Sequence, residues 1–366
     1  MSQKKLATPF TNENISLSNR IVMAPMNRRR AIKGIPSPSM ITYYQQRAGS
    51  GLLISDNIAV SSNGGAYMNT PGIYNKEQKD AWKKVVEGVH AKDGKIFAQL
   101  VQSGRVGHPA IQNNEPLVAP SAISVNETIR IPDNSYQSMT IPVAISTEEI
   151  PVWVQAFKEA AISAVEAGFD GVEIHAAHGF LIDQFTNPLS NTRTDEYGGS
   201  IENRTRFLFE VMQEVIAAVG KNKVGIRLSP FREIYDLKTY PEELTTHEYI
   251  LDELQKLDIL YIHFSNAITD GKPSIPVSFL QNARHRFKNI IMIAGGFTVK
   301  TAEDILQNGL ADMVAFGKLY ISNPDLVERI KSDLPLADWD EETFYHGGDK
   351  GYIDYPDFSY SKCINY

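Results

Sequence analysis

The sequence predicts an α/β fold, a TIM (β/α)8 barrel, and two features of the chain lead to this prediction. Short apolar runs rich in Val and Ile alternate with helical patterns along most of the 366 residues. The apolar runs lack the polar alternation of half-exposed strands, as is typical of parallel strands covered on both faces. Because composition does not change along the chain, we predict one domain over residues 1–366 and keep a doubly wound open sheet as the alternative.

The predicted elements follow in order along the chain. The strands are residues 21–24, 52–55, 96–100, 171–175, 224–228, 260–264, 290–294 and 313–316. The helices are residues 38–48, 76–90, 148–167, 201–219, 247–257, 277–287, 301–308 and 325–331. The third helix is expected to begin beside Ser146 or Thr147, since either hydroxyl can cap a first turn that contains Glu148.

Two segments fall outside this alternation. Residues 1–19 resemble a short hairpin that closes the barrel floor. Residues 101–147 form a long excursion after the third strand, and a loop of this length is usually functional. We expect it to act as a lid over the site.

Composition and charge exclude several classes of function. The net charge is −7 and the only dense basic run is Arg28-Arg29-Arg30, so nucleic-acid binding is not expected. No apolar run reaches the roughly 18 residues of a membrane span, and the N-terminus lacks the apolar core of a signal peptide. The single cysteine, Cys363, excludes an intrachain disulfide and a four-cysteine cluster. We therefore expect a cytoplasmic protein with a small-molecule substrate, acting as a monomer or homodimer.

The ends of the last two strands indicate a phosphate site. The seventh strand is followed by Gly295, Gly296 and Phe297, and the eighth by Gly317 and Lys318. In barrels a phosphate commonly binds at these two loops, where backbone N–H groups converge near a helix N-terminus. The same glycines could instead form ordinary tight turns. A sugar phosphate or FMN would fit such a site equally well.

A pair of histidines lies at the end of the fourth strand. In the run GVEIHAAH, Glu173 and His175 point to one face of the strand, and both histidines lie at the C-terminal mouth of the barrel. With Glu173 and Asp183 they could bind a metal ion, or they could be structural. As hydrogen-bond donors, His175 and His178 could hold a substrate oxygen and stabilise charge that develops on it.

Longer motifs favour the role of His175 and His178 as hydrogen-bond donors to a substrate oxygen. They are APMNR, YYQQRA, GLLIS, NGGAYMNTPGIYN, FAQL, GVEIHAAHGF, GIRLSP and FYHGGDKGYIDYP, and they span nearly the full chain in one order. In these motifs the chain resembles the Old Yellow Enzyme family of FMN-dependent ene-reductases, which includes N-ethylmaleimide reductases. The resemblance implies FMN as cofactor, NADPH or NADH as hydride donor, and no metal ion.

The resemblance also implies which residues contact the flavin. They are Ala24, Pro25, Met26, Asn27, Asn57, Gln99, Arg227, Gly295, Gly296, Phe297, Gly317 and Lys318. Gln99 would hydrogen-bond to the pyrimidine edge, and Arg227 would face N1 and O2, where a cation stabilises the reduced flavin. Taken singly, Gln99 could be a polar residue of the barrel interior, and Arg227 could belong to a structural ion pair.

The implied reaction is reduction of the C=C bond of activated alkenes, namely enones, maleimides and nitroalkenes, and of nitro compounds. His175 and His178 would hold the carbonyl or nitro oxygen, and Tyr67 and Tyr352 would line the substrate pocket. A lyase that uses a Schiff base is disfavoured, because Lys318 is the only lysine at the end of a predicted strand.

Four residues depart from the family pattern. Phe180 stands where the family usually has the tyrosine that delivers the proton, so we expect water or Tyr67 to supply it. Asn27 replaces a threonine or cysteine near flavin O4, and its amide is expected to donate a hydrogen bond there. Asn57 replaces an alanine, and Lys318 replaces an arginine, which gives a point charge at the phosphate. Because Phe180 cannot donate, the alternative is a catalytically weakened FMN-binding flavoprotein with mainly NAD(P)H oxidase activity.

Overall fold

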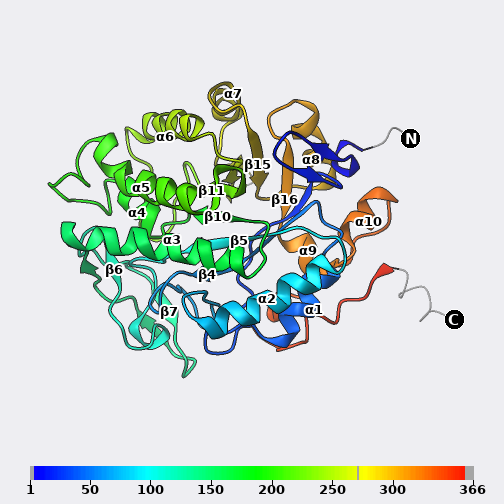
Figure 1. The fold of residues 1–366 in the computed structure, drawn as a ribbon, viewed down its shortest axis with the longest axis horizontal. Coiled ribbons are helices and arrows are strands. Elements are labelled where there is room, and N and C mark those ends of the chain that lie inside the picture. Colours follow the sequence, from blue (N-terminus) through cyan, green and yellow to red (C-terminus); the bar gives the residue numbers. More distant parts are fainter. Residues whose placement is uncertain (1–3, 270–271, 359–366) are drawn as a thin grey trace.

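A computed structural model describes residues 4–269 and 272–358, and its centre is a closed parallel barrel (Figure 1). The strands of the barrel are β3 (Ile21–Met23), β4 (Leu52–Ala59), β5 (Ile96–Val101), β10 (Gly171–His175), β11 (Val224–Leu228), β12 (Tyr261–Ser265), β15 (Ile290–Ala294) and β16 (Met313–Phe316). Neighbouring strands are parallel, and β16 pairs with β3 to close the barrel. The predicted fold is confirmed. Cys363 lies outside the described residues.

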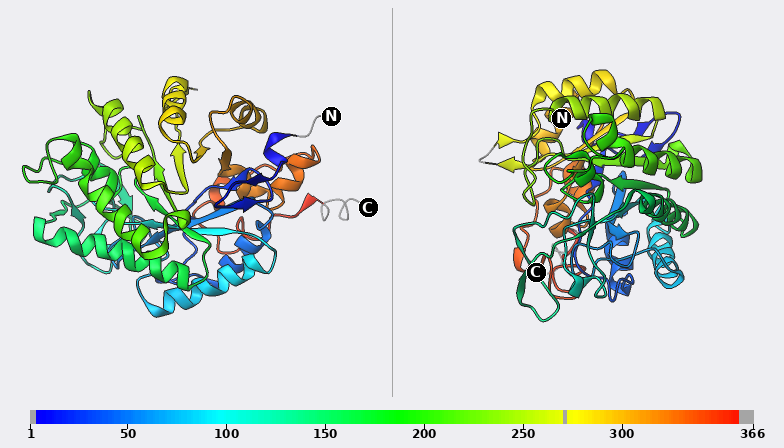
Figure 2. Two further views of the ribbon diagram at one scale, coloured as in Figure 1. Left: turned by 45° about the horizontal axis from the view of Figure 1, so that its top comes forward. Right: turned by 90° about the vertical axis from the view of Figure 1, so that its left-hand side faces the viewer.

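Helices between successive strands surround the barrel (Figure 2). The eight predicted ones are present as α1 (Pro38–Gln46), α2 (Lys76–His90), α3 (Ile150–Glu166), α5 (Ile201–Val219), α6 (Glu243–Leu257), α7 (Val277–Arg286), α8 (Val299–Gln307) and α10 (Leu326–Lys331). Two further short helices, α4 (Leu181–Thr186) and α9 (Lys318–Ser322), follow β10 and β16 and were not predicted.

The strands alternate between two cores, which explains their nearly continuous apolar sequence. On β10, Val172 and Ile174 pack outward in the same core as α3 residues such as Phe157. Glu173 and His175 alternate with them and face the barrel interior. Since both faces are covered, neither face of these strands needs to be polar for solvation.

A hairpin near the N-terminus closes the floor of the barrel, as predicted. It consists of β1 (Phe10–Thr11) and β2 (Ser16–Leu17), which pair antiparallel. Leu17 belongs to the same buried cluster as Leu52 and Ile290, the first residues of β4 and β15. The hairpin therefore seals the ends at which the strands begin.

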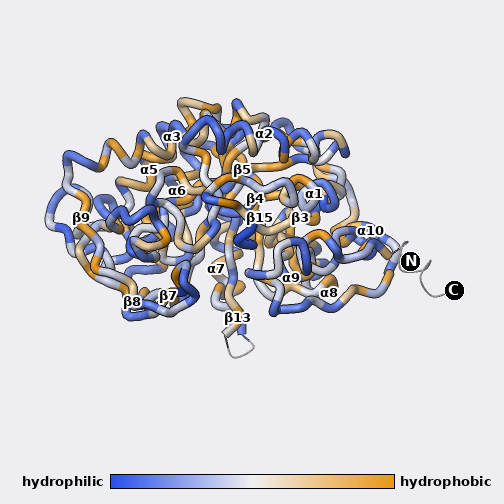
Figure 3. The backbone as a smooth tube through the Cα atoms, turned by 90° about the horizontal axis from the view of Figure 1, so that it is seen from below, coloured by the Kyte–Doolittle hydropathy of each residue, from blue (hydrophilic) through white to orange (hydrophobic). Residues whose placement is uncertain are grey.

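The predicted excursion after the third strand is present and leaves the barrel mouth. It contains β6 (Val118–Ala119) paired with β9 (Val143–Ala144), and β7 (Thr128–Arg130) paired with β8 (Tyr136–Ser138). A second hairpin, β13 (Ile268–Thr269) and β14 (Lys272–Pro273), follows β12. Figure 3 shows β7, β8 and β13 extending on one side of the molecule.

The excursion returns to the barrel through a capped helical turn. Ser146 caps a short 3-10 helix, Thr147–Glu149, in a reciprocal arrangement with Glu149, and α3 follows directly. The prediction of Ser146 as a cap is confirmed. Within residues 4–269 and 272–358, no helix is both long and apolar enough to cross a membrane.

Candidate active site

The barrel interior is apolar near the floor and becomes polar at the C-terminal ends of the strands. Strand register brings the polar residues to one level: Gln99 opposes Glu173 across β5 and β10. His175, Arg227 and His263 are successive partners across β10, β11 and β12. Side chains far apart in sequence therefore converge beneath the barrel mouth.

Glu173 is the centre of a buried hydrogen-bond network. Gln99 Nε2 donates to one carboxylate oxygen at 2.7 Å, and His263 Nδ1 lies 2.8 Å from the other. Burial alone would raise the pKa of Glu173, but His263, Arg227 and Gln99 together lower it. Burial lowers the pKa of His263. We therefore assign an ionised Glu173 that balances the charge of Arg227 and accepts hydrogen bonds from a neutral His263.

His175 and His178 lie together at the mouth. Their ring centroids are 5.1 Å apart and their planes are nearly perpendicular. Burial, reinforced by the charge of Arg227, lowers the pKa of both well below the usual histidine range. The Ala177 amide donates to His175 Nδ1 at 3.3 Å, so the proton of this neutral ring is on Nε2. The site thus offers neutral imidazole donors.

Two serines that sequence reasoning missed position His178. Its backbone N–H donates to Ser229 Oγ at 2.8 Å, which holds the residue at a φ of 60°. Its Nε2 lies 2.8 Å from Ser265 Oγ, and this hydroxyl accepts a hydrogen bond from Arg227 at 3.3 Å. Both serines lie at or just beyond the end of a barrel strand, and only that position would have singled them out.

Asp183 does not join the histidines as a metal ligand. Its carboxylate accepts the Gly179 amide at 2.8 Å, and burial raises its pKa to about 7. Glu173 is directed at Gln99 and His263. In the described part of the chain, no group of three or more His, Cys, Asp or Glu side chains could hold a metal ion.

Arg227 has donor capacity that the protein does not use. Burial lowers its pKa to about 10, so it remains a cation at neutral pH. Its Nη2 reaches only Ser265 Oγ, and its buried Nε has no hydrogen-bond partner among the described residues. A buried guanidinium with unpaired donors fits an electron-rich or anionic group in the barrel mouth.

The loop after β15 has the shape of an anion cradle. Gly295 and Gly296 have φ values of 115° and 69°. A Cβ on Gly295 would overlap the carbonyl of Asn266, and one on Gly296 would overlap the side chain of Ile268. Only glycine therefore brings this backbone to the N-terminus of α8. Phe297, the next residue, is partly buried.

The loop after β16 meets the end of β3 beside this cradle. A Cβ on Gly317 would lie 3.5 Å from Met26 Sδ, so the two loops are in contact. Ala24 is buried, while Pro25 and Met26 are partly buried. Lys318 begins α9, is exposed, and forms a 2.9 Å ion pair with Glu341.

The amide of Asn27 contacts two neighbouring side chains, and its hydrogen bond to flavin O4 stays a prediction. Its Nδ2 donates to Asn57 Oδ1 and to Thr70 Oγ1, each at 2.8 Å, which uses both amide hydrogens. Its Oδ1 accepts the Arg29 amide at 2.9 Å. Asn57 is buried, and its side-chain oxygen is held by the bond from Asn27.

Phe180 packs between the rings of His175 and Tyr235. Its ring is 4.9 Å from His175 and 6.5 Å from Tyr235, and only 4 % of its surface is exposed. The Tyr235 hydroxyl contacts the hydroxyl of Tyr67. Tyr235, which follows β11 by seven residues, was not identified from the sequence.

The prediction that Tyr352 lines the pocket is wrong. Tyr352 is fully buried and stacks on Tyr43 with centroids 4.1 Å apart. Seven residues earlier, Tyr345 is 49 % exposed, and it lines a cavity together with Tyr67. The aromatic that faces this cavity is therefore Tyr345, which the same C-terminal motif contains.

The basic run near the N-terminus holds this C-terminal segment in place. Arg28 donates to the carbonyl oxygens of Phe344 at 2.9 Å and Gly351 at 2.8 Å. Arg30 donates to those of Gly348 and Thr343. Both arginines are buried, so these two residues of the run are structural.

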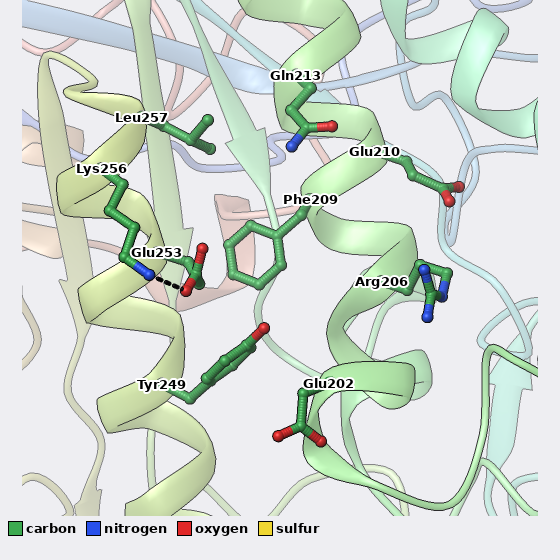
Figure 4. A pocket seen from close by; sticks show the side chains of 9 residues that line it. All are labelled: Glu202, Arg206, Phe209, Glu210, Gln213, Tyr249, Glu253, Lys256 and Leu257. Carbon is green, nitrogen blue, oxygen red and sulfur yellow. Dashed lines mark hydrogen bonds and ion pairs between the residues drawn. The ribbon is translucent and has the colours of Figure 1, made fainter.

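Of two cavities in the described part of the structure, only one is lined by a residue of the predicted site. One of about 560 Å³ lies between α5 and α6 outside the barrel, lined by side chains such as Phe209 and Tyr249 (Figure 4). The other, of about 450 Å³, is lined by Arg29, Tyr67 and Tyr345. Although smaller, the second adjoins the predicted site, and the first contains none of the predicted residues.

The comparisons with known proteins agree with this geometry. The model of the NADH:flavin oxidoreductase / NADH oxidase family matches residues 5–337. A putative 12-oxophytodienoate reductase 11 from Oryza sativa subsp. japonica is 41% identical over 361 residues, which cover 97% of this chain and 98% of the relative.

Solved structures are equally similar. Morphinone reductase has a TM-score of 0.94 at 39% identity, with 98% of each chain covered, and it has also been solved in complex with tetrahydroNAD. An old yellow enzyme homologue from Zymomonas mobilis has a TM-score of 0.92 at 36% identity, covering 96% of this chain and 99% of that one. The chain therefore belongs to the NADH:flavin oxidoreductase / NADH oxidase family, the Old Yellow Enzyme family, and its cofactor is FMN.

Proposed function

We propose that this protein takes hydride from NADPH or NADH and reduces the C=C bond of activated alkenes (enones, maleimides and nitroalkenes), and also nitro compounds. The observation that carries the proposal is the pair of buried, neutral imidazoles of His175 and His178 beside Arg227. Neutral N–H donors at fixed positions can hold a carbonyl or nitro oxygen and stabilise the negative charge that hydride addition creates.

Bound FMN would supply the hydride chemistry between the nicotinamide and the substrate. The unpaired donors of Arg227 would face the flavin, with Gln99 beside them on the neighbouring side of the barrel. The Gly295-Gly296 cradle, with Gly317 and Lys318 opposite, would hold the phosphate. These groups fit an anionic flavin nucleotide in charge and in shape.

The substrate's own contacts would come from around the mouth. His175 and His178 would bind its oxygen, and Tyr67 and Tyr345 would flank the entrance. Low pKa values keep the imidazoles uncharged, so they bind a neutral carbonyl without first losing a proton. We propose one domain over residues 1–366, acting as a monomer or homodimer in the cytoplasm.

The relatives support a nicotinamide donor and a reductase activity. Those named above are reductases, and the morphinone reductase structure with tetrahydroNAD contains a nicotinamide analogue. The alternative function is a weakened flavoprotein that mainly oxidises NAD(P)H. One observation favours it: Phe180 fills the position of the usual acid and has no hydroxyl.

Anaerobic kinetics separate these two functions. The protein is first reduced with NADPH or with NADH, which measures the preference for the donor. The reduced protein is then mixed with an enone, a maleimide, a nitroalkene or a nitro compound. Rapid reoxidation with formation of the saturated product supports an alkene reductase, whereas reoxidation by O2 alone supports the oxidase.

A further inference from the structure

Phe180 has no hydroxyl, but the ring of a neighbouring tyrosine, Tyr235, packs against it and carries one. The ring of Tyr235 lies 6.5 Å from that of Phe180 at an interplanar angle of 23°, and Phe180 in turn contacts the ring of His175. We propose that Tyr235 is a catalytic residue that protonates the α-carbon of the substrate, and that Tyr67 reprotonates Tyr235. This inference rests on the alkene reduction proposed above.

The backbone around Tyr235 is held in a conformation that a free loop would not favour. Tyr235 and Asp236 have φ values of 51° and 61°, in the left-handed region. Ile234 and Leu237 exchange backbone hydrogen bonds of 3.1 and 2.9 Å on either side of them. Two successive non-glycine residues in this region need tertiary contacts that fix them.

Those contacts come from the excursion after β5. Arg105 donates to the carbonyl oxygen of Tyr235 at 2.8 Å, and the Asp236 carboxylate accepts the amide of Asn126 at 2.5 Å. Gly179 also packs closely, because a Cβ there would lie 3.3 Å from the Tyr235 ring. The phenol is therefore aimed from several sides, as a proton donor requires.

The two phenols form a path from solvent to the site. Their hydroxyls are in contact, and each hydroxyl can both donate and accept a hydrogen bond. Tyr67 lines the 450 Å³ cavity, and Tyr235, which is partly exposed as Tyr67 is, packs against Phe180. A proton that enters from the cavity reaches Tyr67 first and Tyr235 second.

Burial and nearby charges keep the phenols of Tyr67 and Tyr235 protonated at rest and stabilise a transient phenolate. Burial raises the pKa of both phenols, so both are protonated at neutral pH. The guanidinium of Arg29 lies 4.9 Å from the Tyr67 ring, and Arg232 opposes the upward shift of the Tyr235 pKa. These cations stabilise a phenolate that exists only between proton transfers.

The proposed step is balanced without another reagent. Hydride addition to the β-carbon leaves an enolate whose oxygen is held by His175 and His178. The O–H bond of Tyr235 breaks as the C–H bond at the α-carbon forms. The resulting phenolate takes the proton of Tyr67, and Tyr67 takes a proton from water, so the net change is one proton from solvent.

A comparison of two electron acceptors tests the transfer of a proton to carbon apart from the other steps of the reaction. An enone needs a proton on carbon, whereas a quinone takes both of its protons on oxygen. In Tyr235→Phe, the ratio of enone to quinone reoxidation rates should fall by about 10²–10⁴-fold, the usual contribution of a general acid. Tyr240→Phe, which removes a phenol of the same loop, should keep the wild-type ratio. Adding Phe180→Tyr to Tyr235→Phe should restore much of it.

An unchanged ratio in Tyr235→Phe would overturn the inference while leaving alkene reduction intact. If the wild type reduces quinones but no enone, the proposed function fails as well, and this outcome is distinct from the first. If Tyr235→Phe does not retain FMN, the relay is tested by Tyr67→Phe in repeated turnover, where Tyr235 must be reprotonated in every cycle, and an unchanged ratio there also overturns it.

A readout other than turnover tests the phenol pair itself. In oxidised, FMN-containing protein labelled with ¹³C at tyrosine Cζ, the Tyr67 signal should move in Tyr235→Phe and stay in place in Tyr240→Phe. Burial raises the pKa of Tyr67, but its hydrogen bond with Tyr235 lowers it. Loss of Tyr235 should therefore shift ionisation of Tyr67 to higher pH. A Tyr67 signal that does not respond would contradict the pair.

Discussion

At the scale of single residues, burial determines what the histidine pair can do. A solvated histidine is partly charged near pH 6.5, whereas His175 and His178 lie beside a buried guanidinium in an enclosed site. Protonating either one would place a second cation next to Arg227. Both rings are thereby restricted to the neutral form, which donates a hydrogen bond without bringing a charge.

The charge state of these rings can be observed directly. In ¹⁵N NMR spectra of the imidazoles, we expect His175 and His178 to remain neutral from pH 8 down to pH 5, because burial and Arg227 lower their pKa values. His175→Ala and His178→Ala assign the signals. Conversion of either ring to imidazolium between pH 7 and pH 5 would contradict this account.

Residue-level prediction from the sequence located a side chain correctly where its position on a strand decides where it lies. His175 and Arg227 lie at the ends of apolar runs, so the barrel fold alone brings them to the mouth. Tyr352 was misplaced for another reason: its role depends on which neighbours cover its ring. Whether Asn27 contacts the flavin depends in the same way on which neighbours use its amide, and this stays a prediction. Tyr235 was missed because its left-handed loop has no sequence signal.

At the scale of elements, the loop after β15 has no room for a side chain at Gly295, a residue of the proposed cofactor site. In Gly295→Ala the new Cβ would overlap the carbonyl of Asn266, so the loop that we propose to hold the phosphate must move. We expect a loss of FMN affinity of tenfold or more, measured by fluorescence titration. Gly309→Ala is the matched control, because its φ of 68° is also left-handed but nothing lies within 4 Å.

This control distinguishes a specific effect of Gly295→Ala on FMN affinity from the general effect of backbone strain on stability. Alanine in the left-handed region costs about 1–2 kcal/mol at either position, so both variants should lose stability. Only Gly295→Ala should release FMN more readily. Equal FMN affinity in the two variants would mean that the loop after β15 does not approach the phosphate.

The first turn of α4 contains a buried carboxyl group, Asp183, that makes stability depend on pH. Burial raises the folded-state pKa of Asp183 to about 7, above its ordinary value of 3.8, so the folded protein binds the extra proton between these values. Its contribution to stability is present at low pH and is lost as pH rises to 7. Asp183→Asn cannot titrate, and its amide oxygen can still accept the Gly179 amide.

Relative to wild type, Asp183→Asn should therefore gain stability as pH rises from 4 to 7. The gain should approach about 1.4 kcal/mol for each pH unit over the steepest part. Urea unfolding of both proteins at pH 4.5, 6 and 8 measures the difference. A difference that does not vary with pH would show that Asp183 keeps an ordinary pKa.

Element boundaries were predictable where a helix or strand is long. The barrel strands agree with the apolar runs to within a few residues, except that β4 continues to Ala59 past a register shift between Ile54 and Asn57. That irregularity turns Asn57 towards Asn27. Helix α6 begins at Glu243, four residues before the predicted 247, because its first turn is polar.

At the scale of the whole molecule, the residues that stabilise the barrel and the polar residues of the candidate site lie at different ends of the strands. The floor and the two apolar cores are independent of any ligand, while the polar groups gather at the opposite end. The excursion after β5 contributes Arg105 and Asn126, which fix the loop that carries Tyr235. Its role as a lid stays a prediction, but its role as a brace for that loop follows from these contacts.

The central claim is that the histidine pair at the barrel mouth makes this protein a reductase of activated alkenes. The most direct measurement is anaerobic reoxidation of the reduced, FMN-containing protein by 2-cyclohexenone, in wild type and in the variant with both His175→Ala and His178→Ala. We predict cyclohexanone from the wild type, and a rate at least about 10²–10³-fold lower in the variant at unchanged FMN content. No cyclohexanone from the wild type, or equal rates in the two proteins, would contradict the claim.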